Sequence, residues 1–364
     1  MNKYNVGIIA KDILNREETG IENYTLSILK EFDKYTNINF TVYINHLDED
    51  HLDGDHLYKS NFKNIKFKYI KNRLFWMHLS LPLQLRKDKL DLIFSPIPSI
   101  PLFTKTKSIV VVHDLSFEYM DQKFIKTTVF FIKHSLDTAT KIIAVSKFTK
   151  DQILSNFKIE ENKIKIIYES CDRDLYKFDK KKRNLRELNI LCVGTINKRK
   201  NFTHIIKTIP ILKKKFDTVK LTIIGKYGDD YINLQKTIED LGVKNDVIIT
   251  GYVPNNELVR YFHKNDVFVY ASKEEGFGIP ILEAYSSGTP VVTSNISATK
   301  EIGESASVLV DPNNFFDIAD GIIAAYENSE ELVELGLIEV KKYTWEKTSK
   351  EIINLIERTL IPKI

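Results

Sequence analysis

The sequence is poor in cysteine and has no long apolar run. Its only two cysteines, Cys171 and Cys192, exclude a disulfide framework and a four-cysteine metal site. No run of about 18 apolar residues occurs, which excludes a membrane-spanning helix. The first residues, MNKYNVGIIAKD, hold an apolar stretch too short for a signal peptide, so we expect it to form the first strand. These features predict a cytoplasmic protein.

The composition indicates a folded chain with more than one domain. Hydrophobic residues make up 43% of the 364 residues and charged residues 28%, which is typical of a packed globular protein rather than a disordered one. A chain of this length exceeds one ordinary α/β core, so two domains are expected.

Short β-branched runs alternate with longer amphipathic stretches, the pattern of βαβ units around parallel sheets. The first half predicts strands at residues 5–10, 40–44, 65–70, 91–95, 108–113, 141–146 and 163–168. The second half predicts strands at 189–193, 220–224, 247–250, 267–270, 290–293 and 307–310. The intervening helices include 22–35, 74–86, 124–138, 147–156, 202–214, 229–241, 256–264, 280–287 and 314–326.

One polar, highly charged stretch, ESCDRDLYKFDKKKRNLRE, interrupts this alternation. We therefore predict an N-terminal Rossmann-like domain over residues 1–170, a linker over 171–187 and a second Rossmann-like domain over 188–343. The terminal helix, 344–364, is expected to pack back toward the first domain. Two doubly wound domains of this kind create a cleft at the carboxyl ends of their strands.

The segment SKEEGFGIPILEAYSSG carries the strongest functional signal. Gly276 and Gly278 follow an expected strand and precede Pro280 at a helix start, where free backbone N–H groups bind anions. Glu283 lies about one turn inside that helix and can accept hydrogen bonds from a ribose diol. We expect Glu275 to be an exposed loop carboxylate placed near the sugar beyond the phosphates. The glycine pattern alone is common at βα turns, and no dinucleotide-binding G-x-G-x-x-G follows the first strand.

The spacing E-x7-E from Glu275 to Glu283 resembles the donor motif of retaining GT-B glycosyltransferases of family 4, also called glycosyl transferases group 1. Further segments are similar to that family: VGTINKRKN, VVHDLSF, TGIENYTLSILKEF, AVSKFTKDQI and ASVLVDP. The resemblance extends from about residue 5 to residue 345. It implies an α/β fold of GT-B architecture, with two Rossmann-like doubly wound domains facing across a cleft and the nucleotide donor bound by the second.

The resemblance also implies roles for individual residues. Glu275 is expected to contact the donor sugar hydroxyls, and Glu283 the ribose. Arg199 and Lys200 are expected to stabilise the charge of the leaving diphosphate. The remaining implied contacts are His113 near the sugar, the backbone of Gly276, Phe277 and Gly278 facing the sugar and diphosphate, and Gly20 in the loop that faces the donor phosphates.

The predicted activity is transfer of a hexose from a nucleotide-diphosphate sugar, GDP-mannose or a UDP-hexose, to a glycan or lipid-linked glycan with retention of configuration. We expect no metal and no cofactor, because Arg199, Lys200 and a helix start can neutralise diphosphate. The D-x-D tracts at 48–50, 53–55 and 172–174 are interpreted as surface charge. The alternatives are a sugar-nucleotide 2-epimerase of the same architecture and a non-catalytic sugar-nucleotide-binding protein.

Positive charge is concentrated within residues 59–89. This tract contains nine lysines and arginines and a single acidic residue, Asp88. It lacks a nucleic-acid-binding motif, so we expect no nucleic acid partner. Two interpretations remain: a solvated lysine-rich face, or peripheral contact with the anionic inner face of a membrane, through Lys66, Lys68, Lys71 and Arg73 in particular.

Overall fold

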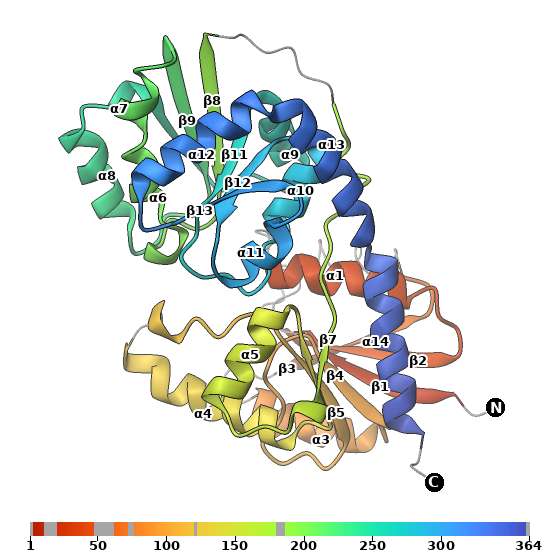
Figure 1. The fold of residues 1–364 in the computed structure, drawn as a ribbon. Helices are drawn as coiled ribbons and strands as arrows, with labels where there is room; N and C mark the ends of the chain where they lie inside the picture. Colours follow the sequence, from red (N-terminus) through yellow and green to blue (C-terminus); the bar gives the residue numbers. More distant parts are fainter. Residues whose placement is uncertain are drawn as a thin grey trace. The chain divides into compact units, whose positions relative to one another are not determined.

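The structure is a computed structural model that describes residues 3–10, 20–46, 62–71, 76–119, 122–179 and 186–361. The chain divides into two compact units (Figure 1). The first consists of Met1–Glu169 together with Trp345–Ile364, and the second of Ser170–Thr344. In the described part of the chain, no helix combines the length and apolar character needed to cross a bilayer.

The first unit is built on a parallel sheet of seven strands in the order β3-β2-β1-β4-β5-β6-β7. The strand order reverses direction between β1 and β4, and ligands bind open α/β sheets at the carboxyl edge of such a switch point. The strands are β1 (Tyr4–Ile9), β2 (Ile38–His46), β3 (Ile65–Lys71), β4 (Leu92–Ser95), β5 (Lys107–Val112), β6 (Lys141–Ala144) and β7 (Ile164–Ile166).

The helices of the first unit include one contributed by the end of the chain, α14 (Trp345–Leu360). The aromatic rings of Tyr24 and Trp345 meet edge to face at 5.6 Å, and Lys107 Nζ donates a hydrogen bond to the Thr359 carbonyl at 2.8 Å. The terminal helix thus packs on α1 and β5 of this unit. The other helices are α1 (Gly20–Phe32), the π-helix η2 (Trp76–Ser80), α3 (Leu81–Lys87), η3 (Phe117–Tyr119), α4 (Gln122–Thr138), α5 (Lys147–Asn156) and η4 (Glu161–Lys163).

The second unit repeats this design with a parallel sheet of six strands in the order β10-β9-β8-β11-β12-β13. Its switch point lies between β8 and β11. The strands are β8 (Glu187–Val193), β9 (Thr218–Ile224), β10 (Val247–Gly251), β11 (Val267–Tyr270), β12 (Val291–Ser294) and β13 (Ser307–Val310). Their β-branched and leucine side chains form a buried core with the neighbouring helices.

The helices of the second unit are mostly short, and the longest are α12 and α13. They are η5 (Lys198–Lys200), α6 (Phe202–Ile206), α7 (Ile209–Leu212), α8 (Tyr231–Asp240), η6 (Lys244–Asp246), α9 (Asn255–Lys264), α10 (Ile279–Ser287), α11 (Ser297–Gly303), α12 (Phe315–Glu327), α13 (Ser329–Glu339) and η7 (Val340–Lys342).

Each predicted strand is present in the sheets, whereas several predicted helices differ. The single helix expected over 202–214 is two short helices, α6 and α7, because Pro210 lacks an N–H group and cannot continue a helix. The helix expected over 74–86 is η2 followed by α3, with Pro82 in the first turn of α3. Two helices, α11 and α13, were not predicted.

The segment expected to be a linker is partly packed into the second unit. Cys171 and Tyr176 are both buried, and the Tyr176 ring meets Phe262 edge to face at 5.7 Å. The boundary between the compact units falls between Glu169 and Ser170, so residues 171–179 belong to the second unit. The buried side chains of Cys171 and Tyr176 anchor this otherwise highly charged segment to the second unit.

Candidate donor-binding site

The candidate site of the second unit lies at the carboxyl ends of β8 and β11, which are neighbours in the sheet. The loop after β8 contains η5, and the loop after β11 contains the glycine-rich segment that ends at α10. These two loops meet at the switch point of the strand order, which is where a doubly wound sheet binds its ligand.

The loop after β8 is fixed to its surroundings by Asn197 and Asn201. Asn197 Oδ1 accepts a hydrogen bond from the Lys200 backbone N–H at 3.1 Å, which caps η5. Asn201 adopts a left-handed conformation with φ of 61°, and its amide donates to the Ala271 carbonyl at 3.0 Å and the Pro312 carbonyl at 2.7 Å. The backbone N–H of Lys273 also donates to the Arg199 carbonyl at 2.9 Å. The two loops are thereby held together.

Arg199, Lys200 and Glu275 form one buried ionic cluster. Arg199 Nη1 lies 2.7 Å from Glu275 Oε2 and 3.1 Å from the Glu274 carbonyl. Lys200 Nζ lies 2.6 Å from Glu275 Oε1 and 2.6 Å from the Tyr270 hydroxyl. A Cβ atom on Gly194 would lie 2.8 Å from Lys200 Cε, so this glycine leaves room for the lysine side chain. Each carboxylate oxygen of Glu275 therefore contacts one cation.

Our expectation that Glu275 is an exposed loop carboxylate is wrong, because its exposed fraction is only 6%. Burial by itself would raise the pKa of Glu275, but the charges of Lys200 and Arg199 lower it below its ordinary value. The carboxylate is therefore ionised, and the three side chains together carry one net positive charge. That excess is suited to an anionic ligand.

The glycine-rich loop presents backbone rather than side chains at the start of α10. Gly278 occupies the N-cap position with φ of 113°, a conformation that favours glycine. It offers no capping side chain, Pro280 has no N–H group, and the Ile281 N–H donates to the Gly278 carbonyl at 2.9 Å, so the N–H of Ile279 is the group that the first three residues of α10 leave for an anion. Phe277 is buried and its ring packs against Tyr343 at 6.1 Å. Gly276 and Gly278 flank this anchored ring, which fixes the course of the loop.

Glu283 lies on α10 and is half-buried, and among the described residues no cation lies near enough to lower its pKa. Burial raises the pKa of this carboxyl from 4.5 to about 7. The Tyr176 hydroxyl partly offsets that rise, although it makes no well-formed hydrogen bond with any described residue. Cys171 lies near the same carboxyl, and burial followed by the Glu283 charge raises the pKa of its thiol. The fold thus keeps a carboxyl group where its ionisation is unfavourable.

The two remaining predicted residues, His113 and Gly20, belong to the first unit. Gly20 is the exposed first residue of α1, and the preceding residues, 11–19, lie outside the described part of the chain. His113 directly follows β5. Its Nδ1 lies 2.6 Å from Glu169 Oε1, its Nε2 lies 2.7 Å from the Pro96 carbonyl, and Tyr24 meets the ring edge to face.

Both ring nitrogens of His113 donate, because a carbonyl and a carboxylate only accept hydrogen bonds. Burial alone would lower the pKa of His113, but the hydrogen bond and charge of Glu169, the Pro96 carbonyl and the Asp114 charge raise it overall. The raised pKa favours the imidazolium form, and because both ring nitrogens have partners within the first unit, the ring can contact a sugar only by exchanging one of them. No functional role was predicted from the sequence for Glu169, which lies beside the expected linker, although its carboxylate contacts His113.

The D-x-D tract that lies in the described region forms a turn. Asp172 Oδ1 accepts hydrogen bonds from the backbone N–H groups of Asp174 and Leu175, both at 3.1 Å. The tracts at 48–50 and 53–55 lie outside the described residues. Within the described ranges, no three His, Cys, Asp or Glu side chains gather as a metal site.

The basic tract of residues 59–89 is less uniform than its sequence indicates. Lys68 contacts Asp88, whose carboxylate also accepts hydrogen bonds from Tyr43 and Gln84. Trp76 and Met77 are buried, whereas Leu79 is 56% exposed. Lys59 and Arg73 lie outside the described residues, and so does the side chain of Lys71. Lys66 is exposed on β3.

Comparison with solved structures places the chain in the GT-B fold class. A glycosyltransferase from Rickettsia africae superimposes with a TM-score of 0.76 at 16% identity, covering 100% of both chains. Anabaena HepE in complex with UDP-glucose superimposes with a TM-score of 0.76 at 16% identity, covering 97% of this chain and 99% of HepE. The predicted fold class, with two Rossmann-like parallel sheets, is confirmed.

Sequence comparison identifies the family. The family model described as Glycosyltransferase Family 4 matches residues 19–175, and the model described as Glycosyl transferases group 1 matches residues 175–337. The chain belongs to this family of glycosyltransferases. Relatives include the O-antigen chain mannosyltransferase RfbU of Salmonella typhimurium, 29% identical over 66% of this chain and 65% of RfbU. A glycosyltransferase of Methanocaldococcus jannaschii is 32% identical over 59% of each chain. The matched region thus spans about six tenths of these two relatives.

Proposed function

We propose that this protein transfers a hexose from a nucleotide-diphosphate sugar to a glycan or lipid-linked glycan, with retention of anomeric configuration. The observation that carries the proposal is the cluster of Arg199, Lys200 and Glu275 at the switch point of the second unit. A net positive, largely buried cluster beside the start of α10 is suited to a sugar diphosphate.

The cluster gives each side chain a distinct task. Breaking the glycosidic bond leaves additional negative charge on the diphosphate, and Arg199 and Lys200 stabilise it in a site where water screens little. An ionised carboxylate offers about four acceptor positions. Two of them on Glu275 are used by the cations, so the others can accept hydrogen bonds from donor sugar hydroxyls. We assign Glu283 to the ribose, as an acceptor of its hydrogen bonds.

Retention requires either two displacements or attack from the face of the leaving group. Glu275 is a poor nucleophile, because both of its oxygens are held by cations and its pKa is lowered. We therefore assign attack from the leaving-group face, with a diphosphate oxygen taking the acceptor proton. The charge that a metal ion would neutralise is balanced here by Arg199, Lys200 and the start of α10, so we expect metal-independent activity.

The relatives support the proposed donor and acceptor classes. The similarity to O-antigen chain mannosyltransferases of Salmonella typhimurium and Escherichia coli supports a mannosyl donor, for which we propose GDP-mannose, and a role in polysaccharide biosynthesis. The HepE complex with UDP-glucose makes a UDP-hexose the other candidate. A lipid-linked acceptor would place the enzyme at the cytoplasmic face of a membrane, with the basic tract of residues 59–89 in contact with anionic lipid.

The test begins with the melting temperature of the protein in the presence of GDP-, UDP- and dTDP-sugars, because a ligand of the folded state raises it. The donor class that raises it is then incubated with acceptors, with and without EDTA, and the anomeric configuration of the product is determined by NMR. We expect a retained product and activity that survives EDTA. Epimerisation without acceptor, an inverted product or strict metal dependence would contradict the proposal.

A further inference from the structure

The last residue of β11, Tyr270, places a buried hydroxyl group inside the ionic cluster of the second unit. The exposed fraction of Tyr270 is 4%, and its hydroxyl accepts a hydrogen bond from Lys200 Nζ at 2.6 Å. The same ammonium donates to Glu275 Oε1 at 2.6 Å and lies 4.5 Å from the centre of the Tyr270 ring. The sequence predicts only a strand position for Tyr270, and the motif that names Lys200 and Glu275 does not include it.

The sheet fixes the position of Tyr270. Tyr270 pairs with Thr293 of the neighbouring strand β12, and the Thr293 hydroxyl donates to the Tyr270 carbonyl at 3.0 Å. The Tyr270 ring stacks on that of Phe268, two residues earlier on β11, with centroids 5.7 Å apart and planes inclined by 24°. The hydroxyl is therefore held by a rigid strand end, and strands position functional groups more precisely than loops do.

The Tyr270 ring also borders the glycine-rich loop. A Cβ atom on Gly278 would lie 3.7 Å from Tyr270 Cε1, which is ordinary van der Waals contact. Gly278 is the N-cap residue of α10, so one tyrosine lies beside both the start of this helix and the ammonium of Lys200. These are the groups to which the proposed function assigns the diphosphate.

Packing alone does not account for the hydroxyl of Tyr270. A phenylalanine, Phe268, fills the core equally well on the same strand and is fully buried. A hydroxyl that is buried without a partner destabilises the fold, whereas a hydrogen bond to a charged group offsets that cost. Burial, followed by the charge of Glu275, raises the pKa of Tyr270, so the hydroxyl keeps its proton at physiological pH. It is therefore a neutral acceptor that leaves the net charge of the cluster unchanged.

The Lys200 ammonium gains from a second acceptor because a lysine side chain is flexible. It is a point charge on a four-carbon stem, without the planar fork that orients an arginine. The Glu275 carboxylate and the Tyr270 hydroxyl together hold the Lys200 nitrogen at two points. A charge that is fixed before the reaction stabilises developing negative charge without the cost of reorganisation.

We infer that Tyr270 is a positioning residue: its hydroxyl fixes the Lys200 ammonium where it stabilises the second phosphate of the nucleotide donor, the phosphate that carries the sugar. This inference rests on the proposed transferase function and adds a residue to its donor site. When the glycosidic bond breaks, its electron pair stays on an oxygen of this phosphate, and Lys200 balances the resulting charge. Tyr270 acts through Lys200 and takes no part in making or breaking bonds.

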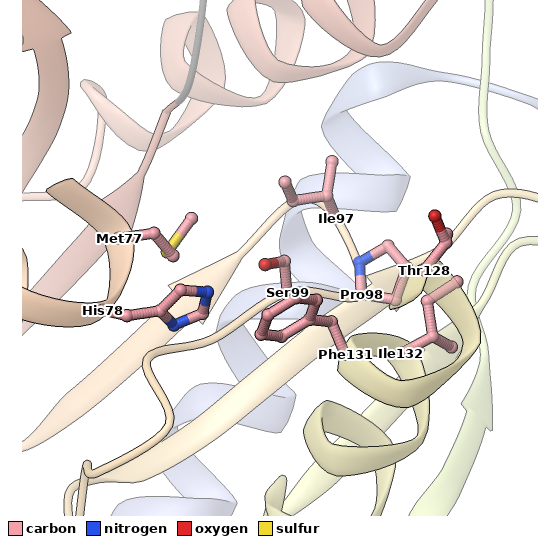
Figure 2. Close-up of a pocket in the computed structure, with 8 residues that line it drawn as sticks. All are labelled: Met77, His78, Ile97, Pro98, Ser99, Thr128, Phe131 and Ile132. Carbon is pink, nitrogen blue, oxygen red and sulfur yellow. The ribbon is translucent and has the colours of Figure 1, made fainter. Parts of the chain in front are cut away.

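A cavity in the first unit is not a rival site for this phosphate. It measures about 440 Å³ and lies between η2, the loop after β4 and α4. Burial, followed by the nearby His134, lowers the pKa of its lining residue His78, so that ring is neutral near pH 7. Figure 2 shows the described lining residues, none of which is a lysine or an arginine: Met77, His78, Ile97, Pro98, Ser99, Thr128, Phe131 and Ile132.

Calorimetric titration of the full chain with UDP and GDP tests the role of Tyr270. The diphosphate that binds is compared with the monophosphate of the same base, UMP or GMP, which lacks the second phosphate. Tyr270→Phe should weaken diphosphate binding about tenfold, because it removes a hydrogen bond that orients a charged group. It should change monophosphate binding less than about twofold, because the base, the ribose and the first phosphate keep their contacts. Unchanged diphosphate binding, or an equal loss with both nucleotides, would overturn the inference.

Tyr285→Phe is the matched control. Tyr285 is 2% exposed and its hydroxyl lies 2.6 Å from Ser307 Oγ, so this variant also loses a short hydrogen bond of a buried tyrosine in the second unit. It should bind both nucleotides as the parent protein does. A loss of diphosphate affinity as large as that of Tyr270→Phe would show that any buried hydroxyl has this effect, which contradicts a specific role for Tyr270.

A double-mutant cycle tests whether Tyr270 acts through Lys200. In a protein that already carries Lys200→Met, Tyr270→Phe should change diphosphate affinity less than about twofold, because the ammonium that it positions is gone. A further loss of about tenfold would show that the hydroxyl acts independently of Lys200 and would overturn the inference. Should Lys200→Met fail to fold, the comparison of diphosphate with monophosphate decides alone.

The same titrations separate the role of Tyr270 from the proposed function. If UDP or GDP binds the parent protein and Tyr270→Phe binds it equally well, the role of Tyr270 fails and the transferase proposal stands. If neither diphosphate binds the parent protein, the transferase proposal fails, and the role of Tyr270 fails with it.

Discussion

Substitution of Glu283 by glutamine separates the stability cost of this carboxyl from its role in donor binding. The pKa of Glu283 rises from 4.5 to about 7 through burial. Between these values the folded protein keeps a proton that the unfolded chain has lost. The free energy of unfolding therefore falls as the pH rises through this window, and the full cost is present above about pH 7. A shift of this size corresponds to at most about 3 kcal/mol, and solvent access to the half-buried side chain reduces it.

A glutamine side chain carries no charge, so the variant should gain this free energy only where the parent carboxyl is ionised. We expect Glu283→Gln to melt several degrees higher than the parent at about pH 8.5 and at nearly the same temperature at about pH 4.5. The control is Glu334→Gln, because Glu334 is exposed on α13. The Glu283→Gln variant should also bind the nucleotide sugar more weakly, by about 1–3 kcal/mol for a lost charged acceptor.

Melting curves at the two pH values test the stability cost of the Glu283 carboxyl, and titration with the donor tests its role in binding. A variant that is less stable than the parent at high pH would refute the cost assigned to the buried carboxyl. Unchanged donor affinity would remove Glu283 from the ribose. Increased stability combined with decreased affinity is the result expected for a group that is kept for binding at the expense of folding.

Three further predictions concern the buried charges and the terminal helix. Glu275→Ala leaves Arg199 and Lys200 without their shared counter-charge, so it should lower stability by about 3–5 kcal/mol in urea unfolding, and a smaller loss would contradict the ionic cluster. Glu169→Gln removes the partner that raises the pKa of His113. The stabilisation that the charged pair gives the folded protein is complete below the ordinary His pKa of 6.5 and disappears as the pH rises through the raised pKa of His113. The variant should therefore lose more stability at about pH 6 than at about pH 9. A pH-independent loss would argue against a charged pair. Ile352→Ala should cost about 2–5 kcal/mol, because Ile352 of α14 is fully buried; a loss below about 1 kcal/mol would show that the terminal helix is dispensable to the first unit.

The strands were predictable from the sequence because buried parallel strands are short β-branched runs, such as Lys107–Val112 and Val291–Ser294. Helix ends were less predictable where prolines interrupt an amphipathic pattern, as at Pro210. The resemblance to a family motif named Arg199, Lys200 and Glu275 as candidate site residues, and the structure brings these three side chains together.

Tertiary contacts between distant residues could not be read from the sequence. Glu275 meets Arg199 across 76 positions, and Glu169 meets His113 across 56. Local pattern therefore predicted an exposed carboxylate at Glu275 and gave no role to Glu169, at the start of the charged stretch, whereas both are buried. The cavity of the first unit could not be predicted from the sequence either, because three separate elements each contribute only a few ordinary apolar residues.

The two carboxyls of the E-x7-E motif differ in environment although they share one loop and helix. Glu275 lies against two cations and has a lowered pKa, whereas Glu283 is half-buried without such partners and its pKa rises to about 7. Groups whose surroundings move their pKa values apart take different parts in a reaction. Glu275 stays charged at every physiological pH and can orient Arg199 and Lys200 toward a diphosphate throughout turnover. Glu283 ionises near neutrality, so a ribose diol that donates hydrogen bonds to its charged form would lower its pKa, and donor affinity should rise with pH across about pH 7.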